Sequence, residues 1–472
     1  MTKPRVALVR YTPDYFMPFG RALEAVGFEV YWINAMRSDS LTLAGAGVPA
    51  QRSLDTSADF QPVDMPMAEC RARLGALERA VDGPRMHDII LMDRLLRKKS
   101  SEDALRYLAH LERIVSNFLI SNRITLVTSG RDTALQLLTM MICRRLGIPW
   151  VVPTRARIPQ EVYGFCQGHD TDEMIRLRAV SEDDYRWATD CLTRFRSRTL
   201  RPALKKSARS FLDVLKLMPG HARVFAYELG KARYDHGNDY SRYTVPSLMR
   251  MYLRRRANML SYKLTPPYRS LGDAPFALYA LHTQPESSID VVGAYFSDQV
   301  HLVRIIARSL PATHELYVKI HPTDIDGQGR DFYAALNAIP GVRLIGHGVD
   351  SMGLLRKTSL LFALTGTIAY EAGLMGRPVI VFANNYFNAL PTIRRCRDVE
   401  ALPTLIAQQL DAPAPDTLEE SLIAYLADLR TCCFDGEVNR TYGASTAPLT
   451  PDDLATLRQA YTALLDHLVA SR

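Results

Sequence analysis

The stretch YALHTQPESSIDVVG, residues 279–293, begins as an apolar run and ends among polar side chains. Carboxylates at the end of a buried strand can act as a base, a nucleophile or a stabiliser of an oxocarbenium ion during sugar transfer. Glu286 and Asp290 are therefore candidate catalytic residues. In the alternative interpretation, Asp290 caps the helix that follows and Glu286 bonds a neighbouring backbone amide. We favour the cap for Asp290 and the catalytic role for Glu286.

A Lys-x-His-Pro element lies at the end of the next strand-like run, ELYVKIHP. Pro322 favours an extended conformation for His321, and Lys319 points to the same side because it lies two residues earlier. An imidazole and an ammonium group in this place can donate to phosphate oxygens. A lone histidine is more often structural, so the prediction depends on the neighbouring strands.

The stretch LTGTIAYEAGLMGRPVIVF predicts a strand, a tight turn and a helix. Gly366 is expected at the turn and Thr367 at the N-cap, so the positive helix end would face a phosphate. Glu371, one helical turn further on, would accept hydrogen bonds from a ribose. The alternative is a plain turn and cap with a solvated acid. The chain has no G-x-x-x-x-G-K-[ST] and no G-x-G-x-x-G, which disfavours a P-loop kinase or an NAD dehydrogenase.

The first half contains a similar pattern, TSGRDTA. Gly130 follows a strand, and a helix is predicted to begin with Arg131 and Asp132. Asp14, in the loop YTPDYF, opens on the same side. We expect these residues to face the second half across a cleft and to bind an acceptor, with Asp132 also a catalytic candidate. The alternative makes Asp132 a plain first-turn acid.

Apolar runs alternate with helical stretches in both halves, which predicts two parallel sheets covered by helices. In such sheets ligands bind at the carboxyl ends of the strands, where the residues named above lie. Residues 35–85 are predicted to be irregular. The expected strands are 5–11, 28–33, 124–130 and 148–154 in the first half, and 275–283, 315–322, 342–347, 360–366 and 378–383 in the second.

The predicted organisation is an α/β chain with two Rossmann-like halves. The expected parts are a first Rossmann-like domain at 1–173, a basic helical insertion at 174–272, a second Rossmann-like domain at 273–400 and C-terminal helices at 401–472 that pack back on the domains.

The positive charge is concentrated in residues 194–269, which carry 18 Lys or Arg and four acids, whereas the whole chain has a net charge of +8. The stretch LMRMYLRRRANMLSY resembles a helix that lies at a membrane interface. The segment contains no recognised nucleic-acid motif. We therefore expect an anionic membrane surface or a charged glycolipid as its partner rather than nucleic acid, and a solvated helical face is the alternative.

The bulk composition is that of a globular protein, with 472 residues, 47% hydrophobic and 23% charged. Seven cysteines without a Cys-x-x-Cys pair disfavour a zinc site and a disulfide framework. The Asp-Ile-Asp stretch at 324–326 lies in a glycine-containing loop, so we expect a turn there and no metal. The sequence shows no signal peptide and no apolar run of about 18 residues. Localisation in the cytoplasm is therefore expected.

The second half resembles the bacterial capsule-polysaccharide synthesis family, which includes the β-Kdo transferases (Kdo is 3-deoxy-manno-octulosonic acid). The similar pieces are QPESSID, LPATHELYVKIHP and TGTIAYEAGLMGRPVIVFANNYF, within residues 275–400. The resemblance implies a GT-B type glycosyltransferase, with two Rossmann-like domains facing across a cleft and the donor bound in the second. It also implies a CMP-activated sugar as co-substrate and a glycan or glycolipid acceptor. Because a CMP-sugar leaves with a single phosphate, we expect no metal or other cofactor. The basic segment favours a peripheral position of the cytoplasmic protein on the inner face of the cytoplasmic membrane.

The resemblance further implies roles for individual residues. It places the phosphate of the CMP-sugar at the Lys-x-His-Pro element, and nucleotide phosphate and ribose at the Gly-Thr-x-x-x-Glu element. The donor-binding residues that follow are Gln284, Ser287, Lys319, His321, Pro322, Gly366, Thr367 and Glu371. The chain departs from the family where Glu286 directly precedes Ser287, because the Kdo transferases tend to have an Asp before the Ser and a longer elbow. A UDP-sugar transferase or a CDP-alditol phosphotransferase with the same fold is the alternative enzyme, and a nucleic-acid-binding protein is the alternative from another class.

Overall fold

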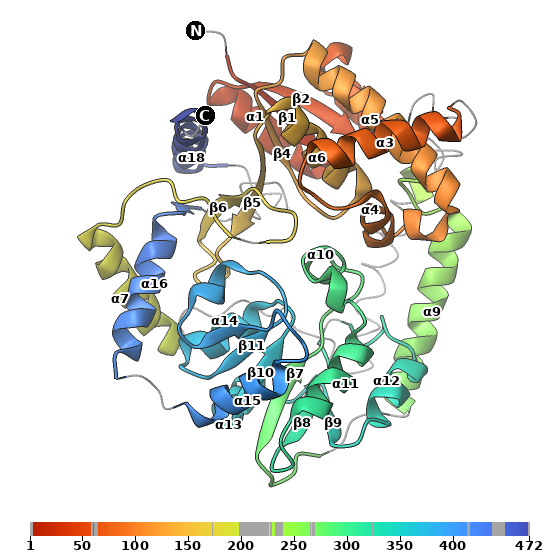
Figure 1. Cartoon of the computed structure of the whole chain (residues 1–472). Coiled ribbons are helices and arrows are strands. Elements are labelled where there is room, and N and C mark those ends of the chain that lie inside the picture. The colour runs from red at the N-terminus through yellow and green to blue at the C-terminus, as the bar shows by residue number, and fades with distance from the viewer. Residues whose placement is uncertain are drawn as a thin grey trace.

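The computed structural model contains two α/β halves that stand one above the other (Figure 1). It describes residues 3–57, 60, 65–171, 173–197, 226, 229–231, 239–264, 266, 270–322, 324–412, 416–436 and 449–470. Much of the predicted basic insertion, including 198–225 and 232–238, lies outside the described residues.

The first sheet has the strand order β13-β6-β5-β4-β1-β2-β3 within the described ranges. Its strands are β1 (Arg5–Val9), β2 (Glu29–Asn34), β3 (Ser53–Asp55), β4 (Leu126–Ser129), β5 (Trp150–Arg155), β6 (Val162–Cys166) and β13 (Phe434–Asp435). The strands β1 to β5 are parallel, and β6 runs antiparallel to both β5 and β13. The parallel sheet predicted for this half is therefore confirmed, with an antiparallel edge that the sequence pattern did not predict.

Side chains of β1 alternate between two hydrophobic clusters, as expected for a strand covered on both faces. Val6 and Leu8 face α1 (Pro13–Ala25) and α18 (Pro451–Ala470), whereas Ala7 and Val9 face α3 (Met67–Ala80), α5 (Ser101–Ser121) and α6 (Ala134–Leu146). The C-terminal helix α18 thus returns to the first half, beside α1 (Figure 1).

The prediction that residues 35–85 are irregular is wrong, because they contain α2 (Arg37–Gly45), β3 and α3. The further helical segments of this half are α4 (Met86–Met92), η1 (Ala50–Arg52) and η2 (Leu96–Lys98). Helix α3 has a weak apolar stripe, in which Cys70, Leu74 and Leu77 are the buried positions. Its remaining surface is charged, which hides the helical period in the sequence.

The second sheet has six parallel strands in the order β12-β11-β10-β7-β8-β9. They are β7 (Phe276–Ala280), β8 (Glu315–Lys319), β9 (Val342–Ile345), β10 (Leu360–Ala363), β11 (Val379–Val381) and β12 (Ile393–Arg395). Counted from β7, the order is 3-2-1-4-5-6, that of a Rossmann fold, and the first sheet has the same order from β1 to β6. The strands follow the predicted ranges but are shorter at their carboxyl ends.

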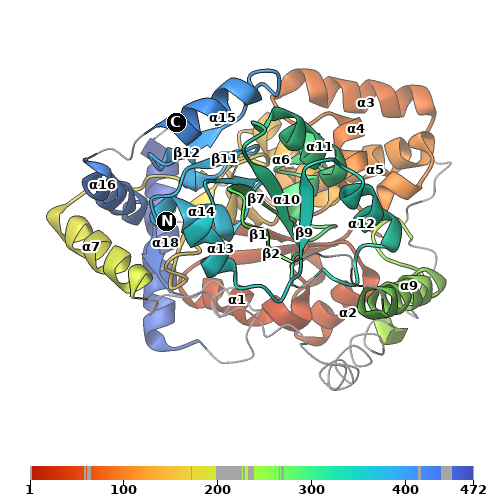
Figure 2. The same cartoon turned by 90° about the horizontal axis from the view of Figure 1, so that it is seen from below.

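Helices cover both faces of the second sheet (Figure 2). They are α11 (Gln299–Ser309), α12 (Arg330–Asn337), α13 (Ser351–Lys357), α14 (Thr367–Leu374) and α15 (Leu402–Asp411). The short helix α10 (Ser287–Asp290) instead lies beyond the strand ends, next to α4 of the first half (Figure 1). Two further short segments are η3 (Ala294–Phe296) and η4 (Tyr386–Ala389). A helix pair, α7 (Glu182–Arg196) and α16 (Leu418–Arg430), packs at the side, where Arg196 pairs with Glu419.

Helix α9 (Val245–Leu264) runs along one flank from the first half to the second (Figures 1 and 2). Before it, the Ser241 hydroxyl donates to the Ala35 carbonyl of the first half at 2.7 Å. Near its end, Asn258 donates to the carbonyl of Asp326 at 3.1 Å, and the Tyr262 hydroxyl bonds Nδ1 of His347 at 2.9 Å. The helix therefore connects the two halves. No helix within the described ranges is long and apolar enough to cross a membrane.

Candidate functional site

The carboxyl ends of β7 and β10 form the topological switch point of the second sheet, because the chain continues from these neighbouring strands toward opposite edges. His282 follows β7 and is buried there. Its Nε2 accepts a hydrogen bond from the Leu364 amide at 3.2 Å, so the end of β7 is tied to the end of β10. Sequence reasoning missed His282, although it lies at the strand end that the pattern identified.

His282 is uncharged at neutral pH. Burial lowers its pKa to about 3, and the neighbouring positive charges of His321 and Arg157 add to this effect. Since Nε2 accepts a hydrogen bond, the single ring proton of the neutral imidazole is on Nδ1. The side-chain amide of Gln299 brackets the same residue, accepting from the His282 amide at 2.8 Å and donating to its carbonyl at 3.0 Å.

Gly366 lies directly against this imidazole. It has a φ of 107°, and a Cβ placed on it would lie 3.1 Å from Cε1 of His282. The structure makes Gly366 the N-cap of α14 and Thr367 the first helical residue, so the predicted cap at Thr367 is wrong by one position. Because the cap is a glycine, it has no side chain that could bond the first amides of the helix.

The neighbouring polar groups complete the edge beside α14. The hydroxyl of Thr365 is buried and has no hydrogen-bond partner among the described residues. Glu371 is half-buried inside α14, one turn beyond its start, where the sequence predicted it. A helix N-terminus next to an unsatisfied buried hydroxyl suits an oxyanion ligand.

Lys319 and His321 lie on the next strand, β8, and beyond its end. Lys319 is buried, its Nζ donates to the His347 carbonyl at 3.3 Å, and burial lowers its pKa to about 8. Nδ1 of His321 bonds the Thr283 hydroxyl at 3.1 Å, and burial together with the charge of Lys319 lowers the His321 pKa. If Thr283 donates in this bond, Nε2 of His321 carries the proton and can donate to a phosphate. Pro322 follows at the half-buried tip.

Gln284 has a structural network around its side chain. Its Nε2 donates to the Ser297 carbonyl at 2.8 Å and its Oε1 accepts from Gln299 at 3.1 Å. Ser287 is the first residue of α10, and its carbonyl accepts the amides of Val291 and Val292. These bonds fix the Gln284 side chain against Ser297 and Gln299.

Glu286 is an exposed side chain at the N-cap of α10. Desolvation raises its pKa, and the negative charge of Asp132 raises it further, whereas Arg157, Ser288 and Arg94 act in the opposite direction. Asp132, also exposed, comes from the first half. Asp132 of the first half is therefore close enough to Glu286 of the second to act on its carboxylate.

Asp290 does not cap the following helix. It is the last residue of α10, and Asp298 caps α11 by accepting from the His301 amide. The Asp290 carboxylate is buried, lies 4.0 Å from Arg97 of the first half and has one oxygen without a hydrogen-bond partner in the described structure. Burial raises its pKa.

The loop before α6 differs from the prediction, since the helix begins at Ala134 and not at Arg131. The Ala134 amide donates to Oδ2 of Asp93 at 2.8 Å, so a carboxylate of the chain itself occupies this helix end. Gly130 allows Gln136 to approach, because a Cβ there would lie 2.8 Å from the Gln136 Nε2. Arg131 is buried and donates to the carbonyls of Gly168 and Thr171.

Asp14 is an ion-paired residue of the first half. Its carboxylate lies 2.8 Å from Nζ of Lys231, which also bonds the buried Asp39 at 3.0 Å. Asp324 lies in a turn, as predicted for the Asp-Ile-Asp stretch, since its carbonyl accepts from the Gly327 amide. Its pKa is raised to about 6 by burial. In the part of the chain that the structure describes, no three His, Cys, Asp or Glu side chains are grouped to hold a metal.

Arg157 is a second residue that sequence reasoning missed. It lies between β5 and β6 with a φ of 65°, and its charge lowers the pKa of both His282 and Glu286. It is therefore close enough to both residues for its charge to act on them. The sequence gives no sign of this positive φ, because an arginine in a loop normally adopts a negative φ.

Residues 232–392, which contain the donor-side residues from Gln284 to Glu371, match the family model described as capsule polysaccharide biosynthesis protein. This part of the chain carries the signature of that family. The resemblance predicted from the sequence is thereby confirmed for the second half. A comparison with curated proteins gives no match.

Among solved structures, the UDP-GlcNAc 2-epimerase from Neisseria meningitidis bound to UDP-GlcNAc is 10% identical, covers 99% of this chain and 100% of its own, and has a TM-score of 0.29. KpsC from Thermosulfurimonas dismutans, described as a beta Kdo 2,7 transferase, is 12% identical with coverages of 67% and 89% and a TM-score of 0.29. The beta Kdo 2,4 transferase of the same protein is 14% identical, covers 65% of this chain and 79% of its own, and has a TM-score of 0.28. Similarity at this level carries no information about the site.

The buried neutral His282 predicts a pH-dependent stability. Its folded pKa is far below the unfolded value of about 6.5, so protonation favours unfolding and stability falls as the pH drops below 6.5. From pH 7 to pH 5 this contributes a loss of about 2 kcal/mol. The variant His282→Gln keeps an acceptor for the Leu364 amide. Between pH 7 and pH 5 its free energy of unfolding should fall by about 2 kcal/mol less than that of wild type, as measured by urea unfolding.

His301→Gln, which changes an exposed histidine on α11, is the matched control and should behave as wild type. An equal loss of stability between pH 7 and pH 5 in wild type and His282→Gln would contradict the assignment of a buried neutral imidazole.

Proposed function

We propose that the protein is a GT-B type glycosyltransferase that moves Kdo or a related nonulosonic acid from a CMP-activated donor to a bacterial surface polysaccharide or glycolipid. One observation carries the proposal: the family-matched half has a Rossmann strand order, with the glycine-capped end of α14 at its switch point and Lys319 and His321 at the end of the adjacent strand β8. All three suit the phosphate of a nucleotide. The second half is therefore the proposed donor domain.

A CMP-sugar leaves with a single phosphate, and this chain has protein groups to balance its charge. The α14 end supplies backbone amides, and Lys319 supplies a cation below its pKa of about 8. The proposed ribose contact is Glu371. These groups reduce the need for a bridging metal, in agreement with the turn found at Asp324.

Glu286 is the proposed catalytic carboxylate. In transfer, a bond forms between the acceptor oxygen and the anomeric carbon while the bond from that carbon to the phosphate oxygen breaks. Glu286 either takes the proton of the acceptor hydroxyl or attacks the anomeric carbon first, and both roles need the ionised form. Asp132 and Asp290 are the other carboxylates at the cleft, and the burial of Asp290 against Arg97 favours a supporting role for it.

The acceptor is proposed to enter from the first half, past Asp132. Of the acceptor residues expected from the sequence, Gly130 shapes the loop, Arg131 holds carbonyls inside the first half, and Asp14 pairs with Lys231. These contacts support a structural contribution to the acceptor side of the cleft. A UDP-sugar transferase or a CDP-alditol phosphotransferase on the same fold is the alternative enzyme, and a nucleic-acid-binding protein that uses the basic segment is the alternative from another class.

Nucleotide selectivity tests the donor. We expect CMP to raise the melting temperature more than UMP or CDP does. At a concentration of one hundred times its Kd, CMP should stabilise the folded protein by about 2.7 kcal/mol. His321→Ala should reduce the CMP effect, because it removes a phosphate donor, and His301→Ala should not. Stabilisation by uridine nucleotides alone would contradict the CMP donor, and an unchanged CMP effect in His321→Ala would contradict the site.

The pH dependence of transfer tests the catalytic carboxylate. Activity should fall with decreasing pH as Glu286 becomes protonated, at a pKa above its ordinary value of 4.5. Asp132→Asn removes the repulsion that raises this pKa, so the acid limb of kcat/KM should move to lower pH. Glu286→Gln should lose about 100-fold to 10,000-fold in kcat. Asp183→Asn, on the exposed face of α7, serves as control. If Glu286→Gln were fully active and Asp132→Asn were inactive, the catalytic carboxylate would be Asp132 and the proposal for Glu286 would be wrong.

We further propose that α9 docks on an anionic membrane surface. Met249, Leu253, Leu260 and Leu264 are exposed on one face of the helix, about 150° from the buried Leu248 and Tyr262. Arg250, Arg256 and Lys263 border this apolar stripe, whereas Arg254 and Arg255 lie further round the helix. An apolar stripe bordered by cations fits a bilayer with negatively charged head groups, which also presents a lipid-linked acceptor.

Flotation with lipid vesicles tests this surface. Wild type should bind vesicles that contain phosphatidylglycerol and bind less at high salt, because the attraction is partly electrostatic. The double variant Leu253→Ser/Leu260→Ser should lose at least tenfold in partitioning. Leu91→Ser, an equally exposed leucine on α4, is the control. Wild type that does not float with anionic vesicles, or a double variant that floats as well as wild type, would contradict the proposal.

A further inference from the structure

Arg157 has an unfavourable backbone conformation that is held by the other half of the molecule. Its φ of 65° is in the left-handed region, which disfavours side chains with a Cβ. The carbonyls on both sides of it accept hydrogen bonds from tyrosines of the second half. The Tyr386 hydroxyl donates to the Ala156 carbonyl, and the Tyr370 hydroxyl donates to the Ile158 carbonyl at 3.3 Å.

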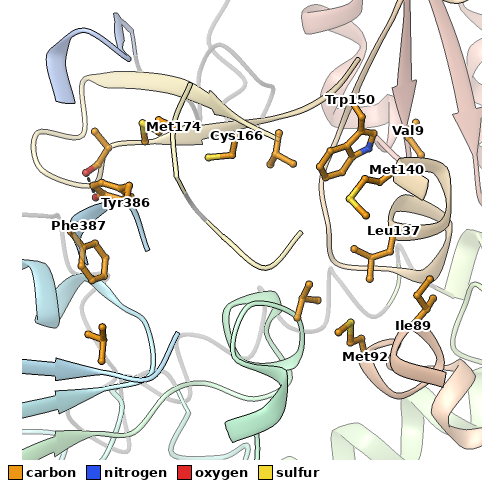
Figure 3. Close-up of a cluster of buried hydrophobic side chains, with 14 of the residues drawn as sticks. Val9, Ile89, Met92, Leu137, Met140, Trp150, Cys166, Met174, Tyr386 and Phe387 are labelled. Atoms are coloured by element: carbon orange, nitrogen blue, oxygen red, sulfur yellow. Dashed lines mark hydrogen bonds between the residues drawn. The ribbon is translucent and has the colours of Figure 1, made fainter. Parts of the chain in front are cut away.

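The two tyrosines belong to the elements that form the proposed donor site. Tyr370 is on α14, whose N-terminus begins at Gly366, and Tyr386 opens η4 after β11. Both side chains are buried. Tyr386 and Phe387 face the hairpin that carries Cys166 and Met174 (Figure 3). The loop of Arg157 is therefore positioned by the donor half, although it belongs to the first half.

The charge of Arg157 acts on the centre of the cleft. It lowers the pKa of His282, beside Gly366, and that of Glu286 on α10. His282 lies against Gly366 and Glu286 is the N-cap of α10, so the Arg157 charge acts on both ends of the segment that follows β7. Strained residues that are fixed by their surroundings are found at ligand sites, where the fixed geometry orders a side chain before binding.

We propose that Arg157 binds an oxyanion of the donor, and so makes the first half part of the donor site. This inference rests on the proposed function. The planar guanidinium offers two parallel N–H donors, which match the two oxygens of a phosphate or of the carboxylate of an acidic sugar. The guanidinium then neutralises the donor only while Tyr370 and Tyr386 hold the loop of Arg157 against the second half. Donor binding is thereby coupled to this contact between the halves.

Three variants separate this role from a structural one. Arg157→Gly adopts the positive φ without strain, so the protein should melt at the same or a higher temperature while the oxyanion contact is lost. Arg157→Lys keeps the charge without the planar fork, and it should recover part of the affinity. Arg155→Met changes the exposed arginine at the end of β5 and is the matched control.

The readout is calorimetric titration of the full chain with cytidine, CMP and CMP-Kdo. If the phosphate is the ligand, Arg157→Gly should lose at least tenfold in affinity for CMP and keep its affinity for cytidine. If the sugar carboxylate is the ligand, the loss appears with CMP-Kdo and not with CMP. Unchanged affinity for all three ligands in a folded Arg157→Gly protein would overturn the proposal.

Uridine and UMP, titrated in parallel, keep the two claims distinct. Binding of UMP but not CMP would refute the proposed donor. In that case, a tenfold loss of affinity for UMP in Arg157→Gly, with unchanged affinity for uridine, would still support the oxyanion role. A wild-type chain that binds none of these nucleotides would overturn both.

Discussion

The contact between Gly366 and the His282 ring is the constraint around which the second half is arranged. A Cβ at Gly366 would lie 3.1 Å from the ring, and the φ of 107° is one that a glycine adopts readily. The ring in turn accepts the Leu364 amide, so the ends of β7 and β10 have one fixed separation. Because the imidazole is buried and neutral, it holds this edge without adding charge. The start of α14 can then face a ligand at a defined place.

The two halves use the same strand order and differ at their switch points. In the first half the amide of Ala134, which begins α6, is already bonded by the carboxylate of Asp93. In the second half α14 begins at Thr367 after the N-cap Gly366, and the buried hydroxyl of the neighbouring Thr365 lacks a partner among the described residues. A helix end that is occupied by the chain's own carboxylate is a poor site for phosphate. This difference supports the proposal that the donor binds in the second half.

The sequence predicted the alternation of strands and helices in both halves and the parallel character of the two sheets. Apolar runs such as LLFALTG are buried on both faces, and this property is visible in the residue types. The details of the edge were less predictable. Helix α10 is only four residues long, so Asp290 looked like the cap of α11, which begins beyond a further turn at Asp298. The positive φ of Arg157 and the burial of His282 arise from contacts between distant segments, which local patterns do not contain.

The position of bound CMP tests the central claim most directly. In a crystal structure of the full chain with CMP, we expect the phosphate against the first amides of α14 and the ring of His321, with the ribose toward Glu371. That result would agree with a donor site at the switch point of the second sheet. A phosphate at the end of α6, or a nucleotide bound away from β7 and β10, would contradict the account.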